Sequence, residues 1–273
     1  MLCHSGGNWW LTVRATIPTP TSPRMPRNKL TFWDKKKGSH QPAATKKSFG
    51  AVTTAKYVVA VTKEKLKRRR SYPQRMNTYP PRRVMFTHLR PDKLPVSVFK
   101  NKAKILMLIR NPKDVAASFF HFSNTFSPYP PYDTFDSYFR ALMEGQMPWG
   151  SYIEYLCVWN KYVDKENVMP ITYEELKANT ALGAEKISKF FELNLSEEDF
   201  RAVAERSTFK SMKENSKTTH GDFGNVLFRK GGVSDWKTLF NESNNKEMDS
   251  VFKERLAGTK VGSMIKYDVY CKA

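Results

Sequence analysis

A short apolar run that leads straight into a helix start limits the folds open to this chain more than any other feature. The run Lys104–Ile109 has the length of a strand and is followed by Arg110-Asn-Pro-Lys113. In that turn Asn111 is a favourable N-cap and Pro112 is a favourable first residue of a helix. Apolar residues then recur at the spacing of one buried helix face, at Val115, Phe119 and Phe122. The segment predicts a buried strand, a tight turn and a helix.

Strand-like and helix-like patterns alternate from Val84 onward. Further strands are expected at Val84–Thr87 and Val168–Tyr173. Further helices are expected at Asp133–Glu144, Tyr152–Val163, Tyr173–Leu193, Ser196–Ser207 and Asn245–Leu256. This succession predicts an α/β fold in which helices cover a parallel sheet. No apolar run reaches the roughly 18 residues of a membrane-spanning helix, so an integral membrane protein is not expected.

Basic residues are concentrated in the first part of the chain. Residues 1–100 contain 22 Lys and Arg against three acidic residues, whereas residues 101–273 contain 24 basic and 23 acidic residues. Leu11–Thr54 is rich in Pro, Thr, Ser and Lys and shows no sustained period, which predicts poor order. The cluster Lys67–Arg70 fits a nuclear-import or nucleic-acid segment, but no aromatic residues in a folded context accompany it, which favours a solvated loop. Nucleic acid is therefore not expected as a partner. The alternative, a nucleic-acid-binding protein, would bind any duplex with a steep dependence on salt.

The cysteines indicate a reducing compartment. Cys3, Cys157 and Cys271 are odd in number, lie far apart and lack the spacing of metal ligands. Met1–Trp10 has no charged stretch followed by an apolar one, as a secretory signal would. The sequence predicts a cytoplasmic protein without a metal site and without membrane contact.

Arg110 is the first candidate ligand-binding residue. The carboxyl end of a strand in an open α/β sheet faces the crevice where ligands bind, and the following helix offers unpaired N–H groups to an anion. Arg110 can form two parallel hydrogen bonds to phosphate oxygens, and Ser118, two turns along the helix, can add its hydroxyl. An ion pair between Arg110 and a nearby acidic residue at the sheet edge is supported equally by this geometry.

Two further segments carry candidate functional groups. In Phe228–Lys237, Arg229 and Lys230 precede two glycines, which let backbone amides approach an anion; taken alone, the motif fits an ordinary surface loop better. His88 stands at the end of the strand predicted at Val84–Thr87, where a histidine can accept a proton near neutral pH, although a lone histidine is more often structural. The two cationic features together favour a phosphate-binding site.

Cys3–Trp10 contains a weaker match. Its Ser-Gly-Gly-Asn resembles the body of a glycine-rich phosphate loop, whose usual context is a preceding strand and a following helix. Only two residues precede it in the sequence, so no strand is expected before it.

Taken in order, five motifs resemble the cytosolic sulfotransferases. They are Thr-His-Leu at 87–89, Arg-Asn-Pro-Lys-Asp-Val with a later serine at 110–118, Thr-Tyr-Glu-Glu-Leu at 172–176, Ser-Thr-Phe-Lys-Ser-Met at 207–212 and Phe-Arg-Lys-Gly-x-x-x-Asp-Trp-Lys at 228–237. The resemblance runs from about Arg75 to Cys271, with fainter similarity at Cys3–Trp10 and Tyr57–Lys65. It implies a single sulfotransferase-type α/β domain at 75–273, similar to P-loop kinases, with a central parallel sheet flanked by helices. An atypical basic segment at 1–74 precedes it, and the implied donor is 3′-phosphoadenosine-5′-phosphosulfate (PAPS).

The resemblance also implies a role for each matching residue. Contacts to the 3′-phosphate of the donor fall on Arg110, Ser118, Arg229, Lys230 and Gly231. Contacts to the adenine and its ribose fall on Tyr173, Thr208, Phe209 and Met212. A remnant of the phosphosulfate loop at residues 3–9 supplies Ser5, Gly6, Gly7, Asn8 and Trp9. His88 matches the catalytic base, which removes the proton of the acceptor as its oxygen attacks sulfur.

Three departures from the family pattern bear on these implications. His4 stands where the phosphosulfate loop has a lysine, and a histidine is shorter and mostly neutral at pH 7. Phe86 stands where many members have a lysine. Lys246 stands where the dimerisation motif ends in glutamate, so the sequence leaves dimerisation undecided.

The sequence supports two functions. The first is transfer of a sulfonate group from PAPS to a hydroxyl or amine of a small lipophilic acceptor, whose identity the sequence does not predict. Aromatic residues that could line an acceptor pocket, each also a candidate for the core, are Phe119, Phe122, Phe126, Tyr129, Tyr132, Tyr138 and Trp149. The alternative is a sulfotransferase-fold protein that binds the nucleotide but transfers poorly because its phosphosulfate loop is incomplete. Binding without turnover would distinguish it.

Overall fold

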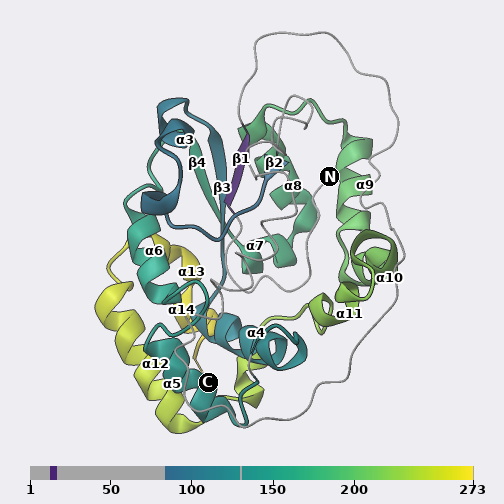
Figure 1. Cartoon of the computed structure of the whole chain (residues 1–273). Coiled ribbons are helices and arrows are strands. Elements are labelled where there is room, and N and C mark those ends of the chain that lie inside the picture. Colours follow the sequence, from purple (N-terminus) through teal and green to yellow (C-terminus); the bar gives the residue numbers. More distant parts are fainter. Residues whose placement is uncertain (1–12, 17–83, 130, 273) are drawn as a thin grey trace, which may run out of the picture. The chain divides into compact units, whose positions relative to one another are not determined.

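The computed structural model of the chain describes residues 13–16, 84–129 and 131–272 (Figure 1). The chain divides into two compact units, residues 1–18 with 81–273 and residues 19–80. The second unit lies outside the described residues, as do the predicted loop at Ser5–Trp9 and the basic cluster Lys67–Arg70. Everything below concerns the described part of the first unit.

Four strands form one sheet: β1 (Val13–Thr16), β2 (Val84–Met85), β3 (Lys104–Ile109) and β4 (Val168–Thr172). Their order is β2-β1-β3-β4, with β3 and β4 parallel and β1 antiparallel to both of its neighbours (Figure 1). The parallel pair and the helices between its strands confirm the predicted α/β fold.

The strand β1 corrects one prediction. It lies inside Leu11–Thr54, for which the composition predicts poor order. Hydrogen bonding to β2 on one side and β3 on the other gives its backbone partners that are distant in the sequence. Strand formation depends on such neighbours more than on local residue preference, so composition alone misses it.

Helices make up most of the remaining structure. They are α3 (Val96–Lys100), α4 (Pro112–Thr125), α5 (Phe135–Met143), α6 (Tyr152–Asn160), α7 (Tyr173–Ala178), α8 (Thr180–Phe191), α9 (Glu197–Arg206), α10 (Phe209–His220), α11 (Phe223–Leu227), α12 (Glu242–Arg255), α13 (Lys260–Ile265) and α14 (Tyr267–Tyr270), with short 3₁₀ turns at Pro91–Lys93 and Asp235–Thr238. Helix α8 packs against β3, and α13 packs against β4 and α6. In the part of the chain that the structure describes, no helix has both the length and the apolar character needed to cross a membrane.

The predicted start of α4 is confirmed. The Asn111 side chain accepts a hydrogen bond of 2.8 Å from the backbone N–H of Asp114, and Pro112 is the first helical residue. Val115, Phe119 and Phe122 are buried, as their spacing predicts. Helix α4 therefore begins three residues after the last residue of β3, with Arg110 and Asn111 in the turn between them.

The single helix predicted over Tyr173–Leu193 is wrong, because Asn179 divides it into α7 and α8. The Asn179 side chain accepts a hydrogen bond of 3.0 Å from the N–H of Leu182 and so caps α8. Asparagine competes with helical hydrogen bonding in this way, and the apolar period continues across the break without revealing it.

The sequence does not predict helix α10, because its residues show little apolar periodicity. Thr208 caps this helix by accepting a hydrogen bond of 3.2 Å from the N–H of Ser211.

Candidate active site

The carboxyl ends of β3 and β4 bring four side chains to one edge of the sheet. The parallel register pairs Ile109 with Thr172, so the residues that follow these two also face one another. The Arg110 guanidinium carbon lies 4.4 Å from the centre of the Tyr173 ring. The Asn111 side-chain amide donates a hydrogen bond of 2.8 Å to Glu174 Oε1, and its backbone N–H donates to the same oxygen at 3.0 Å. This edge is where an open α/β sheet binds its ligand.

Arg110 is fixed at this edge by contacts to both its backbone and its side chain. The Tyr152 hydroxyl donates to the Arg110 carbonyl at 2.7 Å and accepts from the Arg110 N–H at 3.2 Å. The residue is 9% exposed, and its Nη2 donates to the Gly232 carbonyl at 2.9 Å. Its Nε is buried and has no hydrogen-bond partner among the described residues. Because a buried donor normally has a partner, this Nε is a candidate donor to a bound anion.

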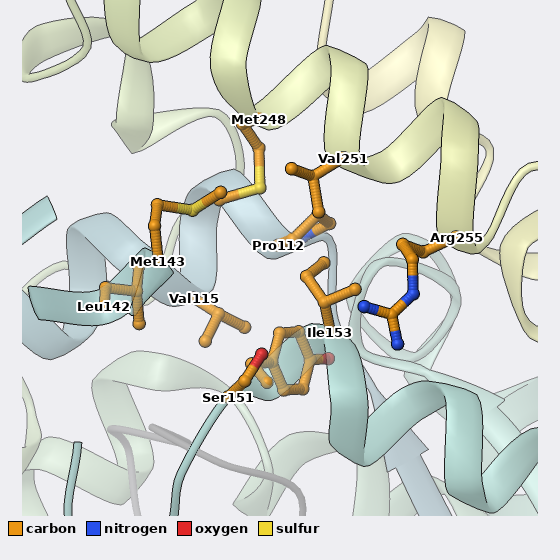
Figure 2. A pocket seen from close by; sticks show the side chains of 10 residues that line it. Pro112, Val115, Leu142, Met143, Ser151, Ile153, Met248, Val251 and Arg255 are labelled. Atoms are coloured by element: carbon orange, nitrogen blue, oxygen red, sulfur yellow. The ribbon is translucent and has the colours of Figure 1, made fainter. Parts of the chain in front are cut away.

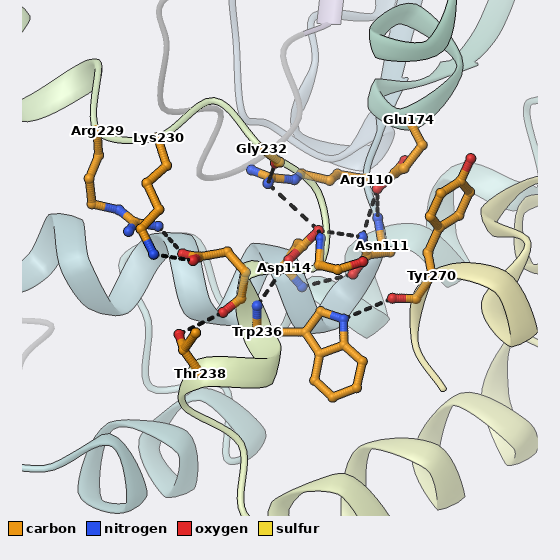
Figure 3. A network of polar contacts seen from close by, with 12 residues as sticks. Arg110, Asn111, Asp114, Glu174, Arg229, Lys230, Gly232, Trp236, Thr238 and Tyr270 are labelled. Carbon is orange, nitrogen blue, oxygen red and sulfur yellow. Dashed lines mark hydrogen bonds and ion pairs between the residues drawn. The ribbon is translucent and has the colours of Figure 1, made fainter. Parts of the chain in front are cut away.

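Asp114 joins the start of α4 to the loop that follows α11. Its Oδ2 accepts from the Ser234 N–H at 2.8 Å and from the Asn111 side-chain amide at 2.8 Å, and its Oδ1 accepts from the Trp236 N–H at 3.2 Å (Figure 3). Arg110 Nη2 lies 3.8 Å from Asp114 Oδ2. The ion pair that the sequence left open for Arg110 thus forms, and it leaves Nε unused. Asp114 is fully buried, and sequence analysis missed it because its partners lie about 120 residues away.

The loop after α11 carries the second cationic feature. Lys230 Nζ lies 2.6 Å from Asp235 Oδ1, and Arg229 donates to the other oxygen of the same carboxylate (Figure 3). Burial acts to raise the pKa of Asp235, but hydrogen bonds and charges from Lys230 and Arg229 outweigh it and hold that pKa below its ordinary value. Two cations on one carboxylate leave a net positive charge on this loop, whose Gly232 carbonyl contacts Arg110.

Gly231 allows this loop to approach α10 closely. Its φ is +63°, and a Cβ at this position would overlap the Phe209 ring. A glycine is required on both counts. The described contacts therefore connect Arg110, Tyr173, the Gly231–Gly232 backbone and Phe209 into one group.

The remaining predicted site residues within the described part of the chain lie on α4, on α10 and after β2. Ser118 is buried on α4, Thr208 is exposed at the N-cap of α10, and Met212 packs half-buried one turn into α10. His88 follows β2 and is half-buried, with its ring centre 5.1 Å from that of Trp149. The predicted residues Ser5–Trp9 lie outside the described part of the chain.

Most of the aromatic residues proposed for an acceptor pocket are core residues. Phe119, Phe122 and Tyr138 are buried. The Phe122 ring lies 4.9 Å from Phe126 and 5.8 Å from Tyr129, so these rings pack on each other. Trp149 differs from them, since it is 44% exposed beside His88.

A pocket of about 190 Å³ lies beside the N-terminus of α4 (Figure 2). It is lined by Pro112, Val115, Leu142, Met143, Ser151, Tyr152, Ile153, Met248, Val251 and Arg255. None of the predicted site residues lines it, although Tyr152, whose hydroxyl contacts the Arg110 backbone, is part of its wall. In the described ranges, no group of three or more His, Cys, Asp or Glu side chains is placed to hold a metal ion.

Glu174 carries a buried carboxyl group whose Oε2 has no hydrogen-bond partner among the described residues. Burial raises its pKa above the ordinary value of 4.5, and hydrogen bonds from Asn111 offset only part of that effect. The folded protein thus holds this proton to higher pH than the unfolded chain does. The free energy of unfolding should decrease as the pH rises from 4.5 through the folded-state pKa.

Glu174→Gln tests this linkage. Glutamine is neutral at every pH and keeps an oxygen that can accept from Asn111. Relative to the parent, the variant should gain more stability, or lose less, at pH 8 than at pH 5. Urea unfolding at the two pH values measures the difference. An identical difference between variant and parent at both would show that Glu174 does not titrate as described.

Comparison with known proteins identifies the family to which the chain belongs. A family model described as the sulfotransferase domain matches residues 21–260. The chain belongs to the sulfotransferase family, as the five motifs predict.

Individual relatives resemble the chain over about three quarters of its length. Sulfotransferase 6B1 of Mus musculus is 52% identical over 200 residues, covering 73% of this chain and 66% of that protein. Sulfotransferase 6B1 of Homo sapiens is 49% identical over 199 residues, with the same coverage of 73% and 66%. The chain thus spans about two thirds of the length of these curated relatives. The crystal structure of mouse sulfotransferase SULT7A1 complexed with PAP superposes with a TM-score of 0.68 at 28% identity, covering 73% of this chain and 74% of that one.

Proposed function

We propose that this chain transfers a sulfonate group from PAPS to a hydroxyl or amine of a small lipophilic acceptor. The observation that carries the proposal is the buried Arg110, whose Nε lacks a partner beside the cationic loop at Arg229–Gly232. A guanidinium with an unused buried donor suits a phosphate oxygen. The mouse relative of known structure is complexed with PAP, the desulfated product of this donor, which supports the same ligand here.

The residues at the site fit such a nucleotide. Arg110, Ser118 and the backbone and cations of Arg229–Gly231 would hold its 3′-phosphate. The ring faces of Tyr173 and Phe209, with Thr208 and Met212, would hold its adenine and ribose. Ser5, Gly6, Gly7, Asn8 and Trp9 would hold the 5′-phosphosulfate. When bound, PAPS supplies an activated sulfonate group.

His88 is the proposed general base. An imidazole nitrogen accepts the proton that leaves the acceptor oxygen or nitrogen as that atom becomes a nucleophile. The centre of the His88 ring lies 5.1 Å from that of Trp149, a partly exposed indole on which an apolar acceptor would pack. Holding base, acceptor and donor in fixed positions supplies much of the rate in a transfer of this kind.

The second candidate, a protein that binds the nucleotide but transfers slowly, rests on His4. A neutral histidine in place of lysine gives less stabilisation to the charge that develops on the leaving phosphate. Tight PAP binding without sulfonate transfer to a phenol would favour this candidate, whereas turnover would favour the first.

Saturating PAP is expected to stabilise the protein, by about 2.7 kcal/mol at 100 times its dissociation constant. Arg110→Ala should weaken PAP binding on the order of 10- to 100-fold, because a charge-assisted contact contributes roughly 1.5 to 3 kcal/mol. Thermal unfolding with and without PAP, together with calorimetric titration, measures both effects. The control is Arg140→Ala on α5, an exposed arginine outside the site, which should bind PAP like the parent. An unchanged melting temperature with PAP, or equal affinity in the Arg110 variant, would contradict the site.

A further inference from the structure

The C-terminal segment Tyr267–Lys272 packs behind the proposed donor site. The Tyr267 ring stacks on Phe252 at 3.8 Å between ring centres, and its hydroxyl donates to Asp249 at 2.6 Å. The backbone carbonyl of Tyr270 accepts from the Trp236 indole N–H at 2.8 Å. The carbonyl of Cys271 accepts from Lys113 Nζ at 2.7 Å. The last two contacts join the segment to the proposed donor site, since Trp236 follows the cationic loop and Lys113 lies in the first turn of α4.

Lys113, which makes one of those two contacts, is 1% exposed. Besides the Cys271 carbonyl, its Nζ contacts Asn245 Oδ1 at 2.9 Å and Asp249 Oδ1 at 2.7 Å, and it lies 4.5 Å from the centre of the Trp236 ring. Three oxygen partners use all three donors of an ammonium group. Lys113 is therefore not available to a ligand, although it lies only three residues after Arg110.

Trp236 connects the segment to the cationic loop. Its backbone N–H donates to Asp114, and its indole N–H donates to Tyr270, so the residue is held from both ends (Figure 3). It follows Asp235, the carboxylate that holds Arg229 and Lys230.

The loop needs such support because its backbone is strained. Ser234 has a φ of +66°, a left-handed conformation that non-glycine residues adopt only when their surroundings impose it. The Ser234 N–H donates to Asp114, and the next anchor along the chain is Trp236.

We propose that Trp236 and Lys113 are positioning residues through which the C-terminal segment sets the affinity of the donor site. The inference rests on the proposed function, since it concerns the same nucleotide site. Trp236 fixes the loop that presents Arg229–Gly232, and Lys113 fixes the first turn of α4 beside Arg110. Loosening either contact should displace the cations and lower affinity for the nucleotide, while His88 and Trp149 stay in place.

Two tryptophans provide a matched test. Trp236 and Trp159 are both buried, but only the Trp236 indole N–H, of these two, donates to the C-terminal segment. Trp236→Phe removes a hydrogen bond to the C-terminal segment, whereas Trp159→Phe removes the same atoms without that bond. By calorimetric titration, Trp236→Phe should bind PAP roughly 3- to 10-fold more weakly than the parent, and Trp159→Phe should bind it like the parent.

Lys113→Met extends the test by removing the charge while keeping the length of the side chain. It should weaken PAP binding about 10- to 100-fold, because the lost contacts are charge-assisted. In steady-state assays both Trp236→Phe and Lys113→Met should raise the KM for PAPS and leave kcat at saturating PAPS unchanged. If Lys113→Met does not fold, the PAP affinities of the two tryptophan variants test the proposal on their own.

The outcomes separate the two proposals. Equal PAP affinity in Trp236→Phe and the parent, with Arg110→Ala still weakened, overturns this inference alone. Equal loss of affinity in Trp236→Phe and Trp159→Phe also overturns it, because the effect would then be general destabilisation. If the parent does not bind PAP, the proposed function is wrong and the inference falls with it.

Discussion

His88→Ala is expected to lower the rate of sulfonate transfer by roughly 100- to 10,000-fold, the usual contribution of a general base. Without the imidazole, the acceptor proton must leave to water as the nucleophile forms. The affinity for PAP should stay close to that of the parent, because the donor contacts proposed here come from Arg110, Tyr173 and the loop at Arg229–Gly232. Turnover of a phenol at saturating PAPS, with PAP titration beside it, measures both quantities.

Added imidazole gives this prediction a sharper readout. It should restore part of the activity of His88→Ala, since a small base can occupy the vacated space, and it should not stimulate the parent. His220→Ala, which removes another partly buried imidazole, is the control and should keep near-parental turnover. A folded His88→Ala protein that transfers sulfonate at the parental rate would remove His88 from the mechanism.

The parts of the site that could be predicted from the sequence are those with local signals. The strand at Lys104–Ile109 shows as an apolar run, and the turn after it shows as an N-cap asparagine followed by proline. These signals place Arg110 at the end of a strand, and the structure shows it there. At the division between α7 and α8, Asn179 is the same kind of signal, but the apolar pattern continues across it and favours one helix.

The parts that could not be predicted depend on contacts between distant segments. Glu174 and Asn111 meet because β3 and β4 are parallel and in one register, which neither segment encodes alone. Asp114, at the third position of a helix, suggests only a favourable interaction with the helix dipole. Its bonds to Ser234 and Trp236 appear once the chain has folded. The sequence therefore predicts where Arg110 lies in the fold better than it predicts the contacts that hold Arg110 in place.

Asp114→Ala is expected to lower the free energy of unfolding by about 3 to 5 kcal/mol, the effect of removing one partner from a buried charged network. The change would leave the N–H groups of Ser234 and Trp236 and the Asn111 amide without their acceptor. It would also leave the nearly buried Arg110 without the carboxylate 3.8 Å from its Nη2. Urea unfolding monitored by tryptophan fluorescence measures the loss.

Asp164→Ala separates this effect from the loss of any aspartate in an ion pair. Asp164 pairs with Lys260, but both side chains are about two thirds exposed. Water and salt screen such a pair, so its removal should change the free energy of unfolding by no more than about 1 kcal/mol. Asp114→Asn should fall between the two variants, because its oxygen can still accept from one N–H while its amide faces another donor. Equal losses for Asp114→Ala and Asp164→Ala would mean that the buried network does not hold the loop onto α4, and the support proposed for the donor site would fail with it.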